Sequence, residues 1–175
     1  MSPCARREIF ELNRGAALGG IVAATAAADQ AAKAAARALL AGRPPIELLG
    51  GFVRVVFVEN VGAFLSLGAR LPETMRFALF VVLVGLGLAA AIAWLLRGAG
   101  NRTFPQSVGL ALVLGGGLGN LIDRLAHGRV VDFLQLRAGT LHTGVFNLGD
   151  LAIVAGVLIW ASARRRMGTK GEESC

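Results

Sequence analysis

The sequence predicts an all-α membrane protein with four transmembrane helices and a small strand-rich segment outside the membrane. Hydrophobic residues make up 55% of the chain and charged residues only 17%, which is more typical of a membrane domain than of a soluble one. Residues 77–96 form an uncharged apolar run as long as the ~20 residues that span hydrocarbon. Three more apolar segments occur, and the 24 glycines favour close packing between membrane helices.

The net charge of +7 does not indicate a nucleic-acid partner. A soluble protein this basic would suggest nucleic acid, but these cations gather at the ends of the apolar segments, where topology and anionic lipid headgroups explain them better. The two cysteines, Cys4 and Cys175, lie at opposite ends of the chain and near no histidine at ligand spacing. We therefore expect membrane lipids as partners, no nucleic acid and no metal site.

The first span is predicted at residues 16–40, after a polar segment at residues 1–15 that we expect to be cytoplasmic. The span is rich in alanine, and its first half carries no charge. Asp29 and Lys33 then follow four residues apart, in the acid-first order that favours an ion pair on one helix face. Two interpretations stay open: an internal salt bridge that makes both groups tolerable, or contact of one of them with a substrate headgroup.

Residues 41–74 are predicted to lie on the membrane rather than in it. Two prolines are followed by FVRVVFVEN, which is rich in Val and Phe and too short to span as a helix. This composition predicts a strand, within an outer β segment at residues 46–66, that ends in a turn at Asn60, Val61 and Gly62.

Three further spans are predicted, at residues 75–96, 107–125 and 148–163. Residues 164–175 begin with three arginines and are predicted to be a disordered cytoplasmic tail. Four spans place both termini on one side of the membrane. Because arginines cluster near both termini and in the 97–102 loop, that side is predicted to be cytoplasmic. The polar stretches 41–74 and 127–147 then lie on the outer face.

Asn120, Asp123 and Arg124 interrupt the end of the third span, within GGGLGNLIDR. Their spacing of three and four residues places them on one helix face. An arginine beside Asp123 would hold that carboxylate ionised, which suits a buried structural cluster better than proton transfer. The glycines before them lie in an apolar span, which favours helix packing over phosphate binding.

Asp132, in VVDFLQL, and Asp150, in FNLGDLAI, are the candidates for acid–base catalysis. Ionisable groups at membrane-associated positions indicate function by default. If the two carboxyls approach closely, they share a proton, and one serves as general base on water while the other serves as general acid. Local alternatives stay open: Asp132 capping a turn, and Asn147 with Asp150 forming a capping box on the fourth helix.

Five motifs resemble, in order and spacing, those of the lipoprotein signal peptidases (signal peptidase II): DQAAK, ENVGAFLS, GGGLGNLIDR, GRVVDF and FNLGD. The resemblance covers residues 16–163. It implies an intramembrane aspartic endopeptidase of the bacterial inner membrane, with its active site toward the outer face and an extramembrane β-cradle at residues 46–66. The implied substrates are lipidated prolipoproteins, whose signal peptides are cut off before a cysteine that carries diacylglycerol. We expect a monomer, and no metal or organic cofactor is implied.

The resemblance also implies roles for individual residues. Asp132 and Asp150 match the catalytic dyad, and Asp29 and Lys33 match a first-helix pair. The supporting polar positions of the family match Asn60, Gly62, Asn120, Asp123, Arg124 and Asn147.

Three positions depart from the family's pattern. Leu65 stands where the family has an aromatic residue, with Phe64 one place earlier, and Gly149 and Leu151 replace the usual Ala and Ser. These departures suit a divergent paralogue, so one alternative function is an impaired paralogue that binds lipoproteins without cutting them. The other is a small transporter or proton relay, which predicts acids spread across the bilayer depth, whereas the acids of this chain gather toward one face.

Overall fold

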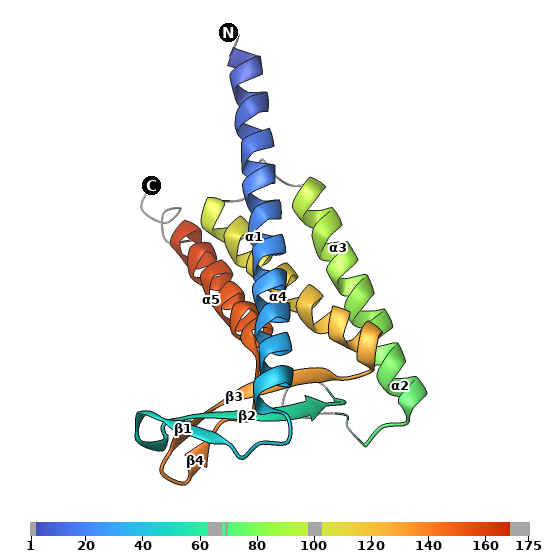
Figure 1. Cartoon of the computed structure of the whole chain (residues 1–175). Helices are drawn as coiled ribbons and strands as arrows, with labels where there is room; N and C mark the ends of the chain where they lie inside the picture. Colours follow the sequence, from blue (N-terminus) through green and yellow to red (C-terminus); the bar gives the residue numbers. More distant parts are fainter. Residues whose placement is uncertain (1–2, 63–67, 69, 98–102, 169–175) are drawn as a thin grey trace.

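Helices stand on one face of a small sheet in the computed structural model, which describes residues 3–62, 68, 70–97 and 103–168. The N-terminal end of the first helix and the C-terminal end of the last both lie away from the sheet (Figure 1). The helical elements are α1 (Pro3–Leu40), α2 (Glu73–Phe77), the π-helical η2 (Ala78–Leu83), α3 (Val84–Arg97), α4 (Phe104–His127) and α5 (Leu148–Gly168). Elements α2, η2 and α3 follow one another directly and form one of the predicted spans.

Helix α4 is the central helix and contacts α1, α3 and α5. It begins after Thr103, which forms a capping box with Gln106, and ends at Gly128, whose φ of 68° is a left-handed conformation that favours glycine. Its glycines allow close packing, since a Cβ on Gly149 of α5 would lie 2.9 Å from the Gly116 carbonyl oxygen. This contact supports helix packing as the reason for the Gly-rich run.

Four antiparallel strands form the sheet, in the order β1-β2-β3-β4. The strands are β1 (Ile46–Leu48), β2 (Val53–Asn60), β3 (Val130–Ala138) and β4 (Leu141–His142), with a short 3-10 turn, η1 (Leu49–Gly51), between the first two. The predicted outer β segment therefore holds two strands, and the second outer stretch adds two that were not predicted. The first four residues of β3 are buried because helices cover that part of the strand.

The pairing of β2 with β3 joins the two outer stretches. It places Val58 opposite Asp132 and Asn60 opposite Val130. The register shifts between Val55 and Val58, an irregularity of the kind that re-aims side chains near functional sites. Two polar side chains that are distant in the sequence, Asn60 and Asp132, consequently come together at one end of the sheet.

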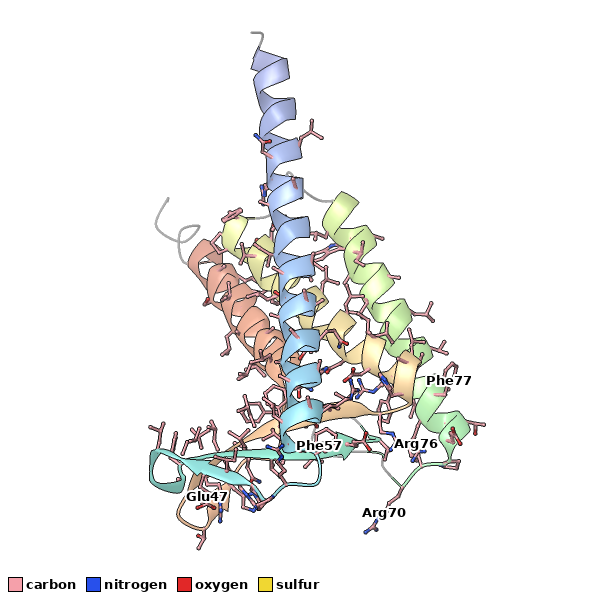
Figure 2. All side chains as sticks on the ribbon, in the orientation of Figure 1. Glu47, Phe57, Arg70, Arg76 and Phe77 are labelled. Atoms are coloured by element: carbon pink, nitrogen blue, oxygen red, sulfur yellow. The ribbon has the colours of Figure 1, made fainter. Side chains whose placement is uncertain are left out.

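A compact apolar cluster fixes the lower end of α1 on the sheet. It consists of Ala36 and Leu40 from the helix with Val131 and Phe133 from β3, and Phe57 of β2 packs against it. Figure 2 shows Phe57 beneath the end of α1. Burial of these side chains stabilises the junction between helix and sheet, and the polar residues of interest lie beside it.

Two helical stretches in the described residues are long and apolar enough to cross a membrane, Glu73–Leu95 and Phe104–His127. Both correspond to predicted spans. Large apolar side chains such as Leu83 and Leu86 are exposed on the first of them, as expected for a helix that faces lipid.

Helices α1 and α5 are also long, but they do not meet the same limits of length, hydropathy and charge. The boundaries differ from those predicted, because α1 already starts at Pro3 and α5 continues to Gly168. The polar residues 3–15 and the first part of the expected disordered tail are thus helical. Residues 169–175 lie outside the described chain.

Candidate active site

The structure links Asp132 of β3 and Asp150 of α5 through Asn147, which is fully buried. The Asn147 side-chain amide donates to Asp132 Oδ1 at 2.7 Å, and its backbone N–H donates to Asp150 Oδ2 at 3.3 Å. The end of α4, strand β3 and the start of α5 meet at this point. The two carboxyl groups therefore form a single polar site, and each is reached by the same asparagine.

The capping box predicted for the last helix is present. Asn147 Oδ1 accepts the Asp150 backbone N–H at 2.9 Å, while the Asp150 carboxylate accepts the Asn147 N–H. This reciprocal pair satisfies two backbone donors at the helix start. The cap and the proposed dyad are thus not alternatives for Asp150, since the cap is what sets the orientation of its carboxylate.

Asn60 and Asn147 both aim their NH₂ groups at Asp132. Asn60 Nδ2 donates to Asp132 Oδ2 at 3.0 Å, while Asn60 Oδ1 accepts the Gly62 backbone N–H at 2.9 Å. A backbone N–H can only donate, so the oxygen of each amide must face its N–H and the nitrogen must face the carboxylate. The backbone thereby fixes which way both amides point.

Asn120 of α4 is the corresponding donor to Asp150. Its Nδ2 donates to Asp150 Oδ1 at 2.9 Å. Its Oδ1 accepts from Lys33 Nζ at 2.7 Å and from Asn147 Nδ2 at 3.1 Å. Both carboxylates of the site therefore receive amide hydrogens from asparagines whose orientation other groups determine.

Burial raises the pKa of the Asp132 carboxyl from 3.8 to about 6. This net pKa includes, besides the dominant effect of burial, a rise caused by the negative charge of Asp150, and the hydrogen bonds from Asn60 and Asn147 and the positive charge of Lys33 partly offset both. Only 3% of Asp132 is exposed, so loss of hydration dominates. A carboxyl with this pKa can hold or release a proton near neutral pH, as acid–base catalysis requires.

The predicted ion pair on α1 is confirmed, with 2.6 Å between Lys33 Nζ and Asp29 Oδ2. Both side chains are completely buried, which favours the internal salt bridge over contact with a headgroup. Lys33 also lies 3.4 Å from Asp123 of α4. Asp29 Oδ1 accepts the Gly149 backbone N–H at 2.8 Å, so the pair reaches α5 as well.

The expected partner of Asp123 was wrong. Arg124 does not pair with it, and the Asp123 carboxylate instead lies near Lys33 and near Arg37, at 3.5 Å from the latter. Asp123 also accepts the Val131 backbone N–H at 3.1 Å. Successive helix residues point in different directions, which explains the error. Asp123 thus ties α4 to α1 and to the sheet, as a buried structural cluster should.

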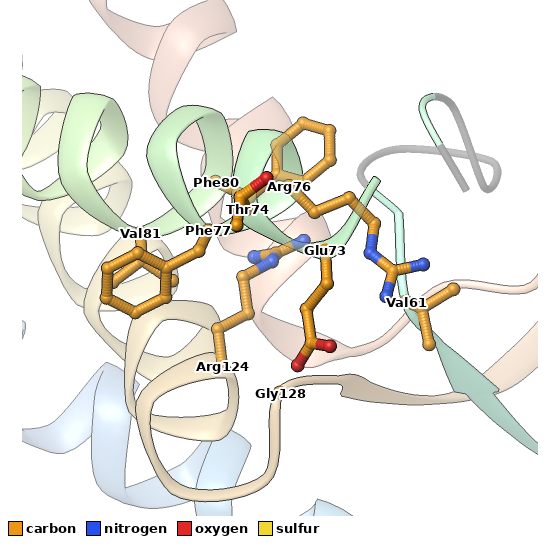
Figure 3. Close-up of a pocket in the computed structure, with 9 residues that line it drawn as sticks. All are labelled: Val61, Glu73, Thr74, Arg76, Phe77, Phe80, Val81, Arg124 and Gly128. Carbon is orange, nitrogen blue, oxygen red and sulfur yellow. The ribbon is translucent and has the colours of Figure 1, made fainter. Parts of the chain in front are cut away.

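Arg124 points toward the turn after β2. Its Nη2 donates to the Gly62 carbonyl oxygen at 2.9 Å, and its guanidinium lies 5.6 Å from the centroid of the Phe80 ring. A cavity of about 400 Å³ opens beside it, lined also by Arg76 and Phe77 of α2 (Figure 3). The cavity therefore lies next to the polar site, on the side where Arg124 contacts Gly62.

A second cavity, of about 410 Å³, borders Asp150 and is otherwise mostly apolar. Phe146 and Val154 line it, together with Leu151, the residue that replaces the family's usual Ser. Phe146 and Val154 could not be recognised as cavity residues from the sequence, since single apolar residues do not indicate a cavity. Phe64 and Leu65, two residues of the ENVGAFLS motif, lie outside the described chain.

Comparisons with known proteins converge on one family. Residues 21–164 match the family model described as Signal peptidase (SPase) II. A "Lipoprotein signal peptidase" of Methylobacterium sp. (strain 4-46) is 41% identical over 150 residues, which cover 81% of this chain and 88% of that protein. The protein of the same name from Burkholderia vietnamiensis (strain G4 / LMG 22486) is 42% identical over 124 residues, covering 70% of this chain and 73% of that protein.

A solved structure has the same fold. It is titled a bacterial membrane enzyme structure by the in meso method at 2.3 Å resolution, and the TM-score is 0.74. The match covers 91% of this chain and 94% of that one, at 22% sequence identity. The arrangement of helices on a small sheet is therefore found in a known membrane enzyme.

Proposed function

The chain belongs to the signal peptidase II family, and from that premise we propose that it removes the signal peptides of prolipoproteins by aspartic-peptidase chemistry. The site residues support the chemical part of this proposal. Asp132, which is buried, and Asp150, which is half-buried, are held in one polar site by Asn147, and we propose that these two carboxyls share a proton. This shared arrangement is the single observation on which the proposed mechanism rests.

The proposed reaction is attack of water on the scissile carbonyl. The ionised member of the dyad accepts a proton as the water oxygen bonds to the carbonyl carbon. The protonated member donates a hydrogen bond to the developing oxyanion and then transfers its proton to the leaving amide nitrogen as the C–N bond breaks. The immediate products are a carboxylic acid and a neutral amine, and the dyad is left with one proton, now on the other carboxyl, so protons and bonds balance.

The remaining polar residues are proposed to hold the dyad in position. Asn60, Asn120 and Asn147 supply the amide donors described above. Arg124 holds the turn after β2 through the Gly62 carbonyl. Asp29, Lys33 and Asp123 form the buried cluster behind them. Preorganised donors of this kind support catalysis because they need not reorient during the reaction.

We propose a membrane domain at residues 16–163, with α1, the α2–α3 stretch, α4 and α5 as its four spans. The N-terminal end of α1 and the C-terminal end of α5 lie on the same side, away from the sheet (Figure 1). A chain with an even number of spans must have both of these ends on one side of the membrane. The arginines near those ends make that side cytoplasmic under the positive-inside rule, with residues 1–15 and 164–175 there. The sheet and the dyad then face outward in the bacterial inner membrane.

The proposed substrate is a prolipoprotein whose cysteine already carries diacylglycerol, and the protein is proposed to act on it as a monomer. The mostly apolar cavity beside Asp150 supports a lipid-bearing or apolar substrate. Cleavage on the N-terminal side of the cysteine would leave the lipid on the product.

Cleavage of a diacylglyceryl-modified prolipoprotein by the purified protein tests the proposal. We expect the wild type to cleave it, and Asp132→Asn and Asp150→Asn each to lower kcat by at least ~100-fold, because an amide cannot exchange the proton. Glu59→Gln is the matched control, since it neutralises an exposed acid of the same sheet that pairs with Arg129. It should cleave at the wild-type rate.

Two outcomes would contradict the proposal. Activity retained in Asp132→Asn would remove that residue from the dyad. A folded wild-type protein that binds the precursor without cutting it would support the impaired paralogue instead.

A further inference from the structure

We propose that the buried Asp29–Lys33 pair of α1 positions the dyad, by holding both the amide that binds Asp150 and the turn that carries Asp150. The inference rests on the proposed function and adds a role to a pair that touches neither carboxylate of the dyad. The pair acts through two separate contacts, one from each member.

Lys33 makes the shorter of the two hydrogen bonds that orient the Asn120 amide, since Asn147 Nδ2 also donates to Asn120 Oδ1, at 3.1 Å. The Lys33 ammonium donates to Asn120 Oδ1 at 2.7 Å, and an ammonium group has hydrogens to donate but nothing with which to accept. The amide oxygen must therefore face Lys33, which leaves the amide nitrogen facing Asp150 at 2.9 Å. Gly62 and Asp150 orient Asn60 and Asn147 through backbone N–H groups, whereas the donors that orient Asn120 are the side chains of Lys33 and Asn147.

Asp29 holds the turn itself. Its Oδ1 accepts the Gly149 N–H at 2.8 Å, one residue before Asp150 in the first turn of α5. The backbone N–H groups at a helix start lack partners within the helix, and a carboxylate also suits the positive end of the helix dipole. Asp29 thus anchors the α5 start to α1, while its other oxygen pairs with Lys33 at 2.6 Å.

Stability alone explains this pair poorly. Burying an ion pair removes the hydration of both charges, and the attraction between them offsets this loss only narrowly. Apolar residues of similar volume in the same place often stabilise the folded protein equally well. Arg37 provides the comparison within the same helix. It lies 3.5 Å from Asp123 and ties α1 to α4, but no contact from it to Asn120 or to the start of α5 occurs among the described residues.

Removal of Lys33 should change how activity depends on pH. Without the ammonium, Asn120 Oδ1 keeps only the longer hydrogen bond from Asn147 Nδ2, so the Asn120 amide is held less firmly toward Asp150. The ionised form of the dyad is then less stabilised, and a higher pH is needed to reach it. Other titratable groups lie near Asp150 or near the residues that contact it. They are Asp132 of β3, Asp29 of α1, Asp123 and Arg124 of α4, and His142 of β4. None of these other side chains changes in Lys33→Met, so the comparison isolates the lysine.

The experiment compares Lys33→Met with Arg37→Met, because each removes a cation of α1 that lies near Asp123. Cleavage of the lipidated precursor is followed from pH 4 to pH 9 together with the thermal midpoint. We expect Lys33→Met to lower kcat by about tenfold to a hundredfold, the effect of losing one hydrogen bond to a charged group. KM should stay near the wild-type value, and the acidic limb of the kcat profile should move up by about one pH unit. Arg37→Met should lower the thermal midpoint but leave that limb in place.

Two further variants keep the result interpretable. Asp29→Asn combined with Lys33→Met restores charge balance in the buried cluster if the single variant does not fold, and it should show the same displaced limb. Asn120→Ala should match Lys33→Met, and the two substitutions together should be no worse than Asn120→Ala alone, since residues acting through one contact are not additive.

The inference would be overturned if the acidic limb of the kcat profile stayed in place in folded Lys33→Met. It would also be overturned if the losses of kcat in Lys33→Met and Asn120→Ala were fully additive. In either case, cleavage by the wild type would leave the proposed function intact. Absence of cleavage by the wild type would overturn both.

Discussion

Asp132 combines almost complete burial with two amide donors, and these have opposite effects on its charge. Burial disfavours the carboxylate, whereas Asn60 and Asn147 stabilise it. The loss of hydration is larger, so the pKa rises to about 6. The residue is therefore poised to exchange a proton at the pH where the enzyme is expected to work.

This shift predicts how stability depends on pH. The folded protein retains the Asp132 proton between pH 3.8 and about 6, while the unfolded chain has released it, so folding stability falls as pH rises through this window. This rise of the pKa from 3.8 to about 6 corresponds to about 3 kcal/mol. Below pH 3.8 the penalty is absent, and above pH 6 it is fully present.

Thermal unfolding in detergent at pH 4 and pH 7 measures this effect. From pH 4 to pH 7, the thermal midpoint of the wild type should decrease by more than the midpoint of Asp132→Asn, because the variant cannot ionise at this position. An equal fall in both proteins would show that the carboxyl is no more costly to ionise in the folded state than in the unfolded one.

At the scale of elements, the approach of α5 to α4 sets the position of the site. The two helices contact each other more extensively than any other pair of elements, and glycines occupy their closest contacts. Gly149 immediately precedes Asp150 and lies against the Gly116 carbonyl of α4. The same residue donates to Asp29, so packing and hydrogen bonding both converge on it.

Gly149→Ala, which introduces the residue usual in the family, should therefore harm this protein. The new Cβ would lie 2.9 Å from the Gly116 carbonyl oxygen, which is backbone and cannot rotate away. Separation of the helices should lower stability by about 1–3 kcal/mol and reduce kcat, as measured by unfolding and by precursor cleavage.

Gly87→Ala on α3 is the control, because nothing lies within 4 Å of a Cβ there. It should leave stability unchanged or slightly improved. A Gly149→Ala protein as stable and active as the wild type would show that α5 can shift without cost.

At the scale of the whole molecule, the N-terminal end of α1 and the C-terminal end of α5 lie opposite the sheet (Figure 1). If the molecule spans the membrane as proposed, one end is cytoplasmic and the other faces outward. Apolar side chains such as Leu86 and Leu158 remain 63% and 64% exposed along the helices between these ends, which suits contact with lipid tails.

Cysteine labelling in intact cells tests this topology. Leu49 is 78% exposed in the η1 turn of the sheet, so Leu49→Cys should react with a membrane-impermeant maleimide added outside. The native Cys4 and Cys175 lie in the segments proposed to be cytoplasmic and should react only after the cells are permeabilised. Labelling of the wild type in intact cells would reverse the proposed orientation.

Local contacts of the site could be predicted from the sequence because helix geometry alone determines them. Asp29 and Lys33 form the expected pair, and Asn147 and Asp150 form the expected capping box. In both cases the partners are three or four residues apart, a spacing that places them side by side at a helix turn. The motif resemblance added the family, which the comparisons show.

Contacts between distant segments were decided only by the tertiary structure. The shifted register of β2 on β3 brings Asn60 to Asp132, and the packing of α1 on α4 brings Lys33 to Asn120. Neighbouring residues could not reveal that Arg124 turns to Gly62 while Asp123 turns to Lys33. The sequence by itself thus determined the presence of the helices, the cap of α5 and the family, because these depend on nearby residues. How each carboxyl receives its own asparagine donors, with Asn147 reaching both, depends on packing between elements, which only the fold supplies.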